Sequence, residues 1–182
     1  KGPLEQSVGG FKYIAYFIDA HTRYIFVRFL RDKSEVLKAT NLTIAEFNAI
    51  VGVPTDDNGK QIGERPRVRT IHSDHEGQYE SHEYEKLRAD EHLHDASSPP
   101  YDHDLNGIAE RAIRTIDEVA TAMRTYCNGK KIYWPYFVRH AVDWHNHLPC
   151  DVGSSTADPR LTPHQRLTLV QPKCLDLATI GS

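Results

Sequence analysis

The sequence feature that most constrains the fold is a pair of short apolar runs separated by a tight polar turn. Tyr13–Ile18 (YIAYFI) and Tyr24–Leu30 (YIFVRFL) are rich in β-branched and aromatic residues, which favour strands. Between them stand His21-Thr22-Arg23, shortly after Asp19. The pattern predicts two strands joined by a turn, with a carboxylate at the end of the first strand.

Segments with helical spacing dominate the rest of the chain. We expect helices from Ser34 as N-cap to about Val51, from Ser81 to Glu91, from about Ile108 to Cys127, from about Trp134 to His147, and a short one opened by Pro163. Further short strands are expected near Arg31, at 67–72 and at 93–97, with polar loops at 52–66 and 98–107. Strands interleaved with helices predict an α/β or α+β layer fold.

The composition is that of a globular domain. The 182 residues are 39 % hydrophobic and 26 % charged, which suffices for one domain with a sizeable core. No apolar run approaches the roughly 20 residues that span a bilayer, and no signal-peptide pattern is visible, so we expect no membrane association. The net charge of −3 argues against a dedicated nucleic-acid-binding module, although not against a metal-dependent enzyme that acts on DNA.

The cysteines and histidines show no zinc-finger spacing. Cys127, Cys150 and Cys174 form no CxxC pair, which predicts reduced thiols in a cytosolic or nuclear compartment. Six of the eleven histidines lie between residues 72 and 103, but none is matched by cysteines at metal-binding spacing. These are His72, His75, His82, His92, His94 and His103.

Three carboxylates are the candidates for catalysis. Asp19 and Asp74 each close a predicted apolar strand, and Glu110 lies one turn inside the predicted helix at 108–127. Taken singly, an aspartate after a strand usually forms a turn, and a helical glutamate usually faces solvent. At 3.6 residues per turn, however, Glu110 lies on a different face of its helix from the apolar stripe. That stripe comprises Ala109, Ala112, Ile113, Ile116, Ala120 and Met123.

Three carboxylates that converge would repel one another and raise one another's pKa unless a cation lay between them. Magnesium prefers oxygen ligands and keeps positions for water and phosphate oxygens. Two such ions can hold the attacking and leaving oxygens of an in-line displacement. A convergent carboxylate triad would therefore indicate phosphoryl-transfer chemistry.

Four strings occur in the order seen in copia-type retrotransposon integrases, which this chain resembles over nearly its whole length. They are GFKYIAYFIDAHTRYIFVRFLRDKSE, IHSDHEGQY, NGIAERAIRTI and WPYFVRHAVDWHNHLP, and the tail TPHQRLTLVQPKCLDLATIGS also resembles the segment after the family's core. Residues 75–109 separate Asp74 from Glu110, which matches the family's D,D-35-E spacing.

The resemblance implies an RNase H-like fold, with a mixed central sheet flanked by helices. It implies that residues 1–182 form a catalytic core, with 151–182 a C-terminal extension packed on the core or trailing from it. Asp19 and Asp74 would bind one Mg²⁺ or Mn²⁺ ion, and Asp19 and Glu110 a second, with DNA bound. The implied activity is 3′-end processing and joining of DNA ends to target DNA.

The resemblance also implies partners and a location. The partners would be DNA, both element ends and target DNA, and further copies of the chain in a homodimer or higher multimer. Zinc-binding and basic DNA-binding modules would lie outside this fragment. The protein would act in the nucleus after a cytoplasmic particle stage.

Two segments differ from the family pattern. His75-Glu76-Gly77 stands where Asn-Gly-Gly is usual, and Asp102-His103-Asp104-Leu105 stands where Pro-Gln-Gln usually precedes Asn106-Gly107. Both changes place additional acidic residues beside the proposed site. Two other functions therefore stay open: an RNase H-like nuclease without joining activity, and a degenerate or domesticated core that serves dimerisation or DNA tethering.

Asn106, Arg111 and Arg114 are the candidate DNA-binding residues. Arginines on the helix of Glu110 can contact phosphates, but pairing with Asp117 and Glu118 on the same helix is an equally simple interpretation. On the following helix, Tyr133 and Tyr136 fall partly off the apolar stripe, which favours a subunit interface. The core stripe predicted there is Trp134, Phe137, Val138, Ala141 and Trp144.

Overall fold

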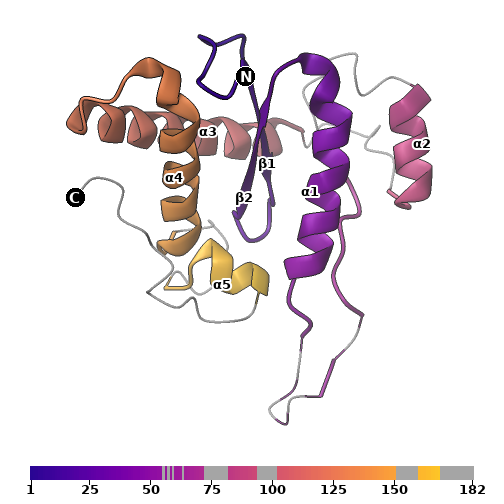
Figure 1. The fold of residues 1–182 in the computed structure, drawn as a ribbon. Helices are drawn as coiled ribbons and strands as arrows, with labels where there is room; N and C mark the ends of the chain where they lie inside the picture. Colours follow the sequence, from indigo (N-terminus) through magenta and orange to yellow (C-terminus); the bar gives the residue numbers. More distant parts are fainter. Residues whose placement is uncertain are drawn as a thin grey trace.

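The computed structural model describes most of the chain. The described residues are 1–54, 56, 58, 60–62, 64–71, 82–93, 102–150 and 160–168, with only the backbone of 102–106. Asp74 and the predicted strand at 93–97, apart from Leu93, lie outside them. Figure 1 shows a central hairpin with helices on both sides.

The two predicted strands pair as an antiparallel hairpin. β1 (Tyr13–Ile18) and β2 (Ile25–Leu30) run in a register that places Tyr13 opposite Leu30 and Ile18 opposite Ile25. Within the described residues this hairpin is the only sheet. Together with the helices it confirms the mixed α/β class, whereas a larger central sheet stays a prediction.

The segment after β2 differs from the prediction. No strand forms near Arg31; instead the Asp32 side chain accepts a hydrogen bond from the Ser34 amide at 2.9 Å and caps the 3₁₀ helix η1 (Lys33–Glu35). That turn continues into α1 (Val36–Ile50). Asp32 rather than Ser34 is the N-cap, because its carboxylate satisfies an amide that the helix leaves without an internal partner.

The predicted strand at 67–72 is also absent over its described part, 67–71. The Val68 amide donates to the side chain of Asn48 on α1 at 3.4 Å, so the segment is held by a helix rather than by a strand ladder. Leu93, the first residue of the predicted strand at 93–97, is also not in a strand. Its side chain packs in the core with residues of α2.

The remaining helices are α2 (His82–Asp90), α3 (Asp102–Tyr126), η2 (Lys131–Tyr133), α4 (Trp134–His147) and α5 (Pro163–Thr168). α2, α4 and α5 agree with the predicted helices. The predicted loop at 98–107 is wrong from residue 102 onward, since α3 begins at Asp102. A sequence with aspartates at 102 and 104 is compatible with a first helical turn, where acidic residues are generally favourable. No helix in the described part of the chain has the length and apolarity to cross a membrane.

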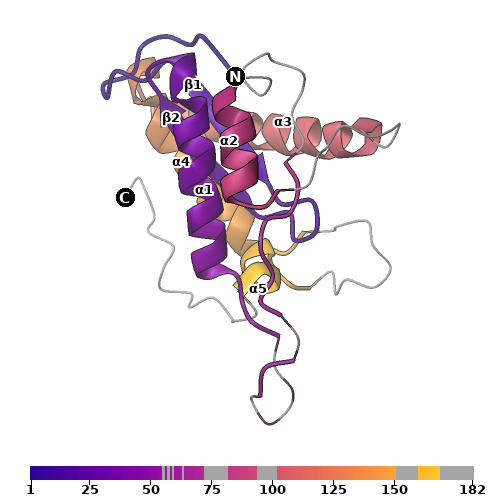
Figure 2. The ribbon, with the colours of Figure 1, turned by 90° about the vertical axis from the view of Figure 1, so that its right-hand side faces the viewer.

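The hairpin is packed on both faces. One face lies against α3 and α4 through a continuous apolar cluster, and the other lies against α1 and α5. Figure 1 shows α4 on one side of the two strands and α1 on the other, with α5 near the lower end of α4, and Figure 2 shows α1 in front of α4. The first cluster comprises Ile14, Ile25, Val27, Ile116, Ala120, Val138, Ala141 and Val142. The second is centred on Phe26, Val51 and Leu167.

The apolar stripe predicted for α3 is confirmed, because Ile116 and Ala120 are buried and the rest of the stripe is partly buried. On α4 the prediction holds for Val138 and Ala141 but fails for Trp144, which is 42 % exposed. The buried stripe there passes through Val142 and Asn146 instead. Trp144 therefore lies at the edge of the buried face, where its ring contacts His140 at 5.7 Å.

Candidate active site

Asp19 occupies the turn that joins β1 to β2. Its backbone amide donates to the Tyr24 carbonyl at 2.9 Å, and its carbonyl accepts from the Arg23 amide at 2.8 Å. Its carboxylate oxygen Oδ2 accepts two hydrogen bonds from Thr22, at 2.9 Å from the amide and 2.6 Å from the hydroxyl. No described residue donates to the second oxygen, Oδ1, which leaves Oδ1 available as a ligand atom.

Arg23 closes the same turn in a left-handed conformation, with φ of 66°. Its carbonyl lies 3.0 Å from Nε2 of His145 on α4, which fixes the end of the hairpin to that helix. Burial is the main cause that lowers the pKa of Arg23; Arg111 and Arg166 lower it further, while Cys150 and Asp19 raise it. The Arg23 guanidinium is therefore within electrostatic range of both Asp19 and Arg111, the residue after Glu110.

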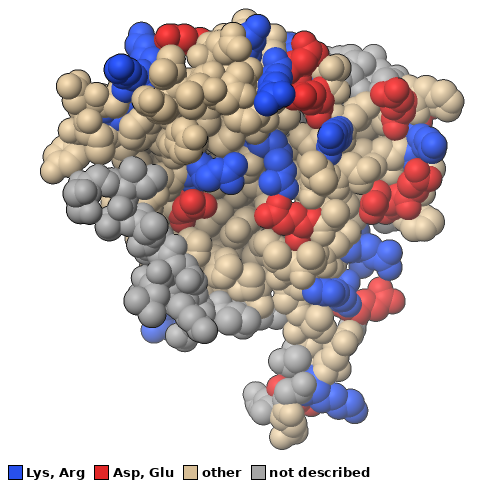
Figure 3. All heavy atoms as spheres, in the orientation of Figure 1, with Lys and Arg blue, Asp and Glu red and all other residues tan. Residues whose placement is uncertain are grey.

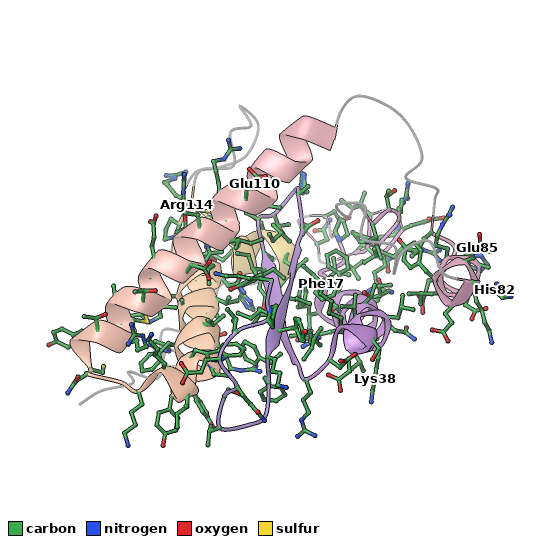
Figure 4. The ribbon with its side chains drawn as sticks, turned by 90° about the horizontal axis from the view of Figure 1, so that it is seen from above. Phe17, Lys38, His82, Glu85, Glu110 and Arg114 are labelled. Carbon is green, nitrogen blue, oxygen red and sulfur yellow. The ribbon has the colours of Figure 1, made fainter. Side chains whose placement is uncertain are left out.

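Glu110 is exposed on α3, as predicted, and lines an open groove of about 700 Å³ along that helix. Figure 4 shows Glu110 and Arg114 projecting from α3 about one turn apart. The described walls of the groove are Glu110, Ile113, Arg114, Asp117, Glu118, Thr121 and Ala122. The predicted polar face of α3 thus borders a surface depression.

Asp117 has partners that sequence reasoning missed. Its carboxylate forms an ion pair with Lys1 and accepts a hydrogen bond from the Tyr16 hydroxyl at 3.3 Å. Burial and the neighbouring Asp117 carboxylate raise the pKa of Tyr16, so this hydroxyl keeps its proton. Asp117 therefore joins α3 to β1, and the described residues show no ion pair of Asp117 with Arg114.

The predicted site residues are described to different extents. Asp19 and Arg111 are both within electrostatic range of Arg23, and Glu110 and Arg114 are exposed on the helix of Arg111. Asp74 lies outside the described residues, and of Asn106 only the backbone, within α3, is described. Among the described residues no three histidine, cysteine or acidic side chains gather as a metal site. Convergence of the triad stays a prediction.

The donors that are described suit a hard cation. Asp19 offers the carboxylate oxygen Oδ1, which takes no part in the hydrogen bonds within the turn, and Glu110 offers an exposed carboxylate. Oxygen donors of this type are those that Mg²⁺ takes in proteins. The spacing of Asp19 and Thr22 is a sequence signal that could have predicted their hydrogen bonds, because aspartate side chains often accept bonds from residues two or three positions onward.

Comparison with known proteins places the chain among retrotransposon sequences. It is 30 % identical over 149 residues to the retrovirus-related Pol polyprotein from transposon TNT 1-94 of Nicotiana tabacum, covering 81 % of this chain and 10 % of that protein. It is 30 % identical over 144 residues to the Pol polyprotein from transposon RE2 of Arabidopsis thaliana (79 % and 9 %). The corresponding protein from transposon RE1 of that plant is 32 % identical over 140 residues (76 % and 8 %). No family model matches the chain.

These similarities confirm the family that the motifs indicate. About four fifths of the chain is homologous to a segment of the retrovirus-related Pol polyproteins of copia-type plant retrotransposons. It spans about a tenth of the length of the relatives it matches.

Proposed function

We propose that this chain is the catalytic core of a retrotransposon integrase, a metal-dependent polynucleotidyl transferase with an RNase H-like fold. The observation that carries the proposal is the arrangement of Asp19. Thr22 holds one carboxylate oxygen at the end of the partly buried strand β1, and the other oxygen accepts nothing from the described residues. The matching D,D-35-E spacing and the retrotransposon relatives support it.

Asp19, Asp74 and Glu110 would hold two Mg²⁺ or Mn²⁺ ions when DNA is bound. Such ions supply activation of a water or a DNA 3′-hydroxyl and neutralise charge on the phosphate. Within the protein, Thr22 orients Asp19 through the two hydrogen bonds that it donates to one carboxylate oxygen. Asn106, Arg111 and Arg114 would contact the DNA backbone, where arginines position a duplex without reading its sequence.

The wider proposal concerns partners and place. Element ends and target DNA would be the substrates, with a homodimer or higher multimer as the active form. Zinc-binding and basic DNA-binding modules elsewhere in the polyprotein would position the DNA end relative to the active site. The reaction would take place in the nucleus after a cytoplasmic particle stage.

A degenerate or domesticated core is the second candidate. Glu76, Asp102 and Asp104 stand near Asp74 and Glu110 in sequence, at positions where the family pattern is uncharged. Like charges there disfavour the approach of phosphates. In this reading the fold would serve dimerisation or DNA tethering without chemistry.

A branched DNA that mimics a joined end tests the proposal, because a junction that is already assembled needs the metal site but little end recognition. Purified chain with Mg²⁺ or Mn²⁺ should resolve the branch, and chelation with EDTA should stop the reaction. Linear ends assayed in parallel should be joined poorly, since this fragment is acidic and non-specific DNA affinity depends on neutralised phosphates. A folded protein that leaves the branch intact with either metal would favour the degenerate core.

A further inference from the structure

A basic and aromatic surface lies at the far end of α3 from Glu110. Between Glu118 and Asp143 the chain has no acidic residue, although its net charge is −3. The same stretch carries four cationic residues, Arg124, Lys130, Lys131 and Arg139. Figure 3 shows Lys and Arg side chains over the turn between α3 and α4, at the upper left.

Exposed tyrosines stand among these cations. Tyr126, Tyr133 and Tyr136 are 90 %, 41 % and 58 % exposed, and they are the only tyrosines among the large hydrophobic residues exposed in the described part of the chain. The rings of Tyr133 and Tyr136 lie 6.2 Å apart, at successive turns of η2 and α4. Val8 is 56 % exposed, and its backbone amide donates a hydrogen bond to the carbonyl of Ile132, the residue before Tyr133, at 3.0 Å. We call Tyr126, Lys130, Lys131, Tyr133 and Tyr136 the α3–α4 surface.

The packing beneath this surface is well defined. Arg124 donates to the Gly129 carbonyl at 3.4 Å, and a side chain at Gly129 would meet the Phe137 ring at 2.5 Å. The Trp134 indole donates to the Glu5 carbonyl at 2.9 Å, which anchors the N-terminal segment. These contacts hold the turn, so its exposed lysines and tyrosines are presented from a fixed backbone.

We propose that the α3–α4 surface binds single-stranded nucleic acid. Lysines attract the phosphates, and exposed tyrosine rings offer faces on which unpaired bases stack. Lys130 and Lys131 make no ion pair with any described residue, so their charge is available to a polyanion. A second copy of the chain suits the surface less well, because a two-fold contact centred on Lys130 and Lys131 would bring like charges together.

The surface is separate from the proposed active site. Tyr126 lies sixteen residues beyond Glu110 on α3, or about 24 Å at a rise of roughly 1.5 Å per residue. That distance corresponds to about seven nucleotides of stacked strand at roughly 3.4 Å each. A strand shorter than about seven nucleotides on this surface would therefore not reach Glu110, and its binding requires neither metal nor catalysis.

Fluorescence anisotropy in EDTA tests the proposal with labelled 20-nucleotide oligo(dT), oligo(rU) and a 20-base-pair duplex. Lys130→Glu/Lys131→Glu should weaken binding of the single strands by about tenfold or more. The matched control is Lys38→Glu/Lys86→Glu, which changes two exposed helical lysines on α1 and α2 and reaches the same net charge. It should weaken binding by less than about threefold. The two oligonucleotides decide between DNA and RNA as the bound strand.

Tyr133→Ala/Tyr136→Ala separates stacking from charge. It should weaken single-strand binding by about tenfold and duplex binding little, because only unpaired bases present their faces. Circular dichroism melts would verify that all variants fold. Equal losses in both lysine pairs, or duplex binding as strong as single-strand binding and insensitive to the tyrosines, would overturn the proposal. So would a dimer, seen by sedimentation, that the tyrosine variant abolishes while oligonucleotide binding is unchanged; the surface would then belong to a second copy.

Discussion

Thr22 binds Asp19 through its amide and its hydroxyl, and the hydroxyl lies 2.6 Å from Oδ2 of the carboxylate. The same hydroxyl accepts a hydrogen bond from the Tyr24 amide at 3.2 Å. A buried threonine therefore connects the proposed metal ligand to the first residue after the turn. The rotamer of Asp19 depends on a residue that has no chemistry of its own.

Replacing Thr22 by valine should affect both stability and activity. Thr22→Val removes the hydroxyl that serves Asp19 and Tyr24 while keeping the shape, so we expect a loss of about 1–3 kcal/mol in the free energy of unfolding. Metal-dependent DNA cleavage should fall as well, since Asp19 is less well oriented. Thr22→Ser restores the hydroxyl and should recover most of both. Urea titration and the branched-DNA assay measure the two effects; wild-type values for Thr22→Val would show that the turn does not position Asp19.

The second prediction concerns Asn146, which is buried on α4 and bonded to the backbone of Ile25 on β2. Its side chain accepts from the Ile25 amide and donates to the Ile25 carbonyl, both at 2.9 Å. Asn146→Leu should cost about 2–4 kcal/mol in unfolding free energy, because two buried backbone groups lose their partner. Asn41→Leu on the exposed face of α1 is the matched control and should stay within about 0.5 kcal/mol. Similar losses for the two variants would contradict the role of Asn146.

The third prediction is a pH effect at His145. Burial lowers the pKa of His145 below its ordinary value. The folded protein therefore binds this proton less readily than the unfolded chain, so the contribution of His145 to stability is fully present above the unfolded pKa and is lost as pH falls from there through the folded pKa. Stability should decrease from pH 7 to pH 5, and His145→Gln should reduce that slope. Denaturant titrations across this range measure it; parallel curves for the two proteins would exclude His145 as the titrating group.

Local patterns predicted several elements correctly. The strands at Tyr13–Ile18 and Ile25–Leu30 follow from β-branched and aromatic residues around a polar turn, and α4 has the bounds that its spacing indicates. The start of α3 was missed because the two prolines and the glycine of 98–107 suggest a loop, whereas the helix begins at Asp102 and continues through Gly107. Tertiary context overrides such local preferences.

Parts of the candidate site lay beyond sequence reasoning for a physical reason. Asn146 and Ile25 are 121 positions apart in sequence, and Asp117 and Tyr16 are 101 positions apart. No local pattern encodes such pairs. Trp144 was predicted in the core from its apolar character, but the packed face of α4 turns it to the edge. Glu110 was placed correctly because helical periodicity alone separates its face from the apolar stripe.

The most direct test of the proposed function compares two glutamates in the same groove of α3. Glu110 and Glu118 are both exposed and both line that groove, but only Glu110 belongs to the proposed triad. In Mg²⁺-dependent resolution of branched DNA, Glu110→Gln should reduce the rate at least about 100-fold, because an amide lacks the charge that a metal ligand supplies. Asp19→Asn and Asp74→Asn should reduce the rate by a similar factor, and all three variants should fold like the wild type. Glu118→Gln should keep wild-type activity. An active Glu110→Gln protein, or equal losses for the two glutamates, would contradict the assignment of Glu110 as a catalytic metal ligand.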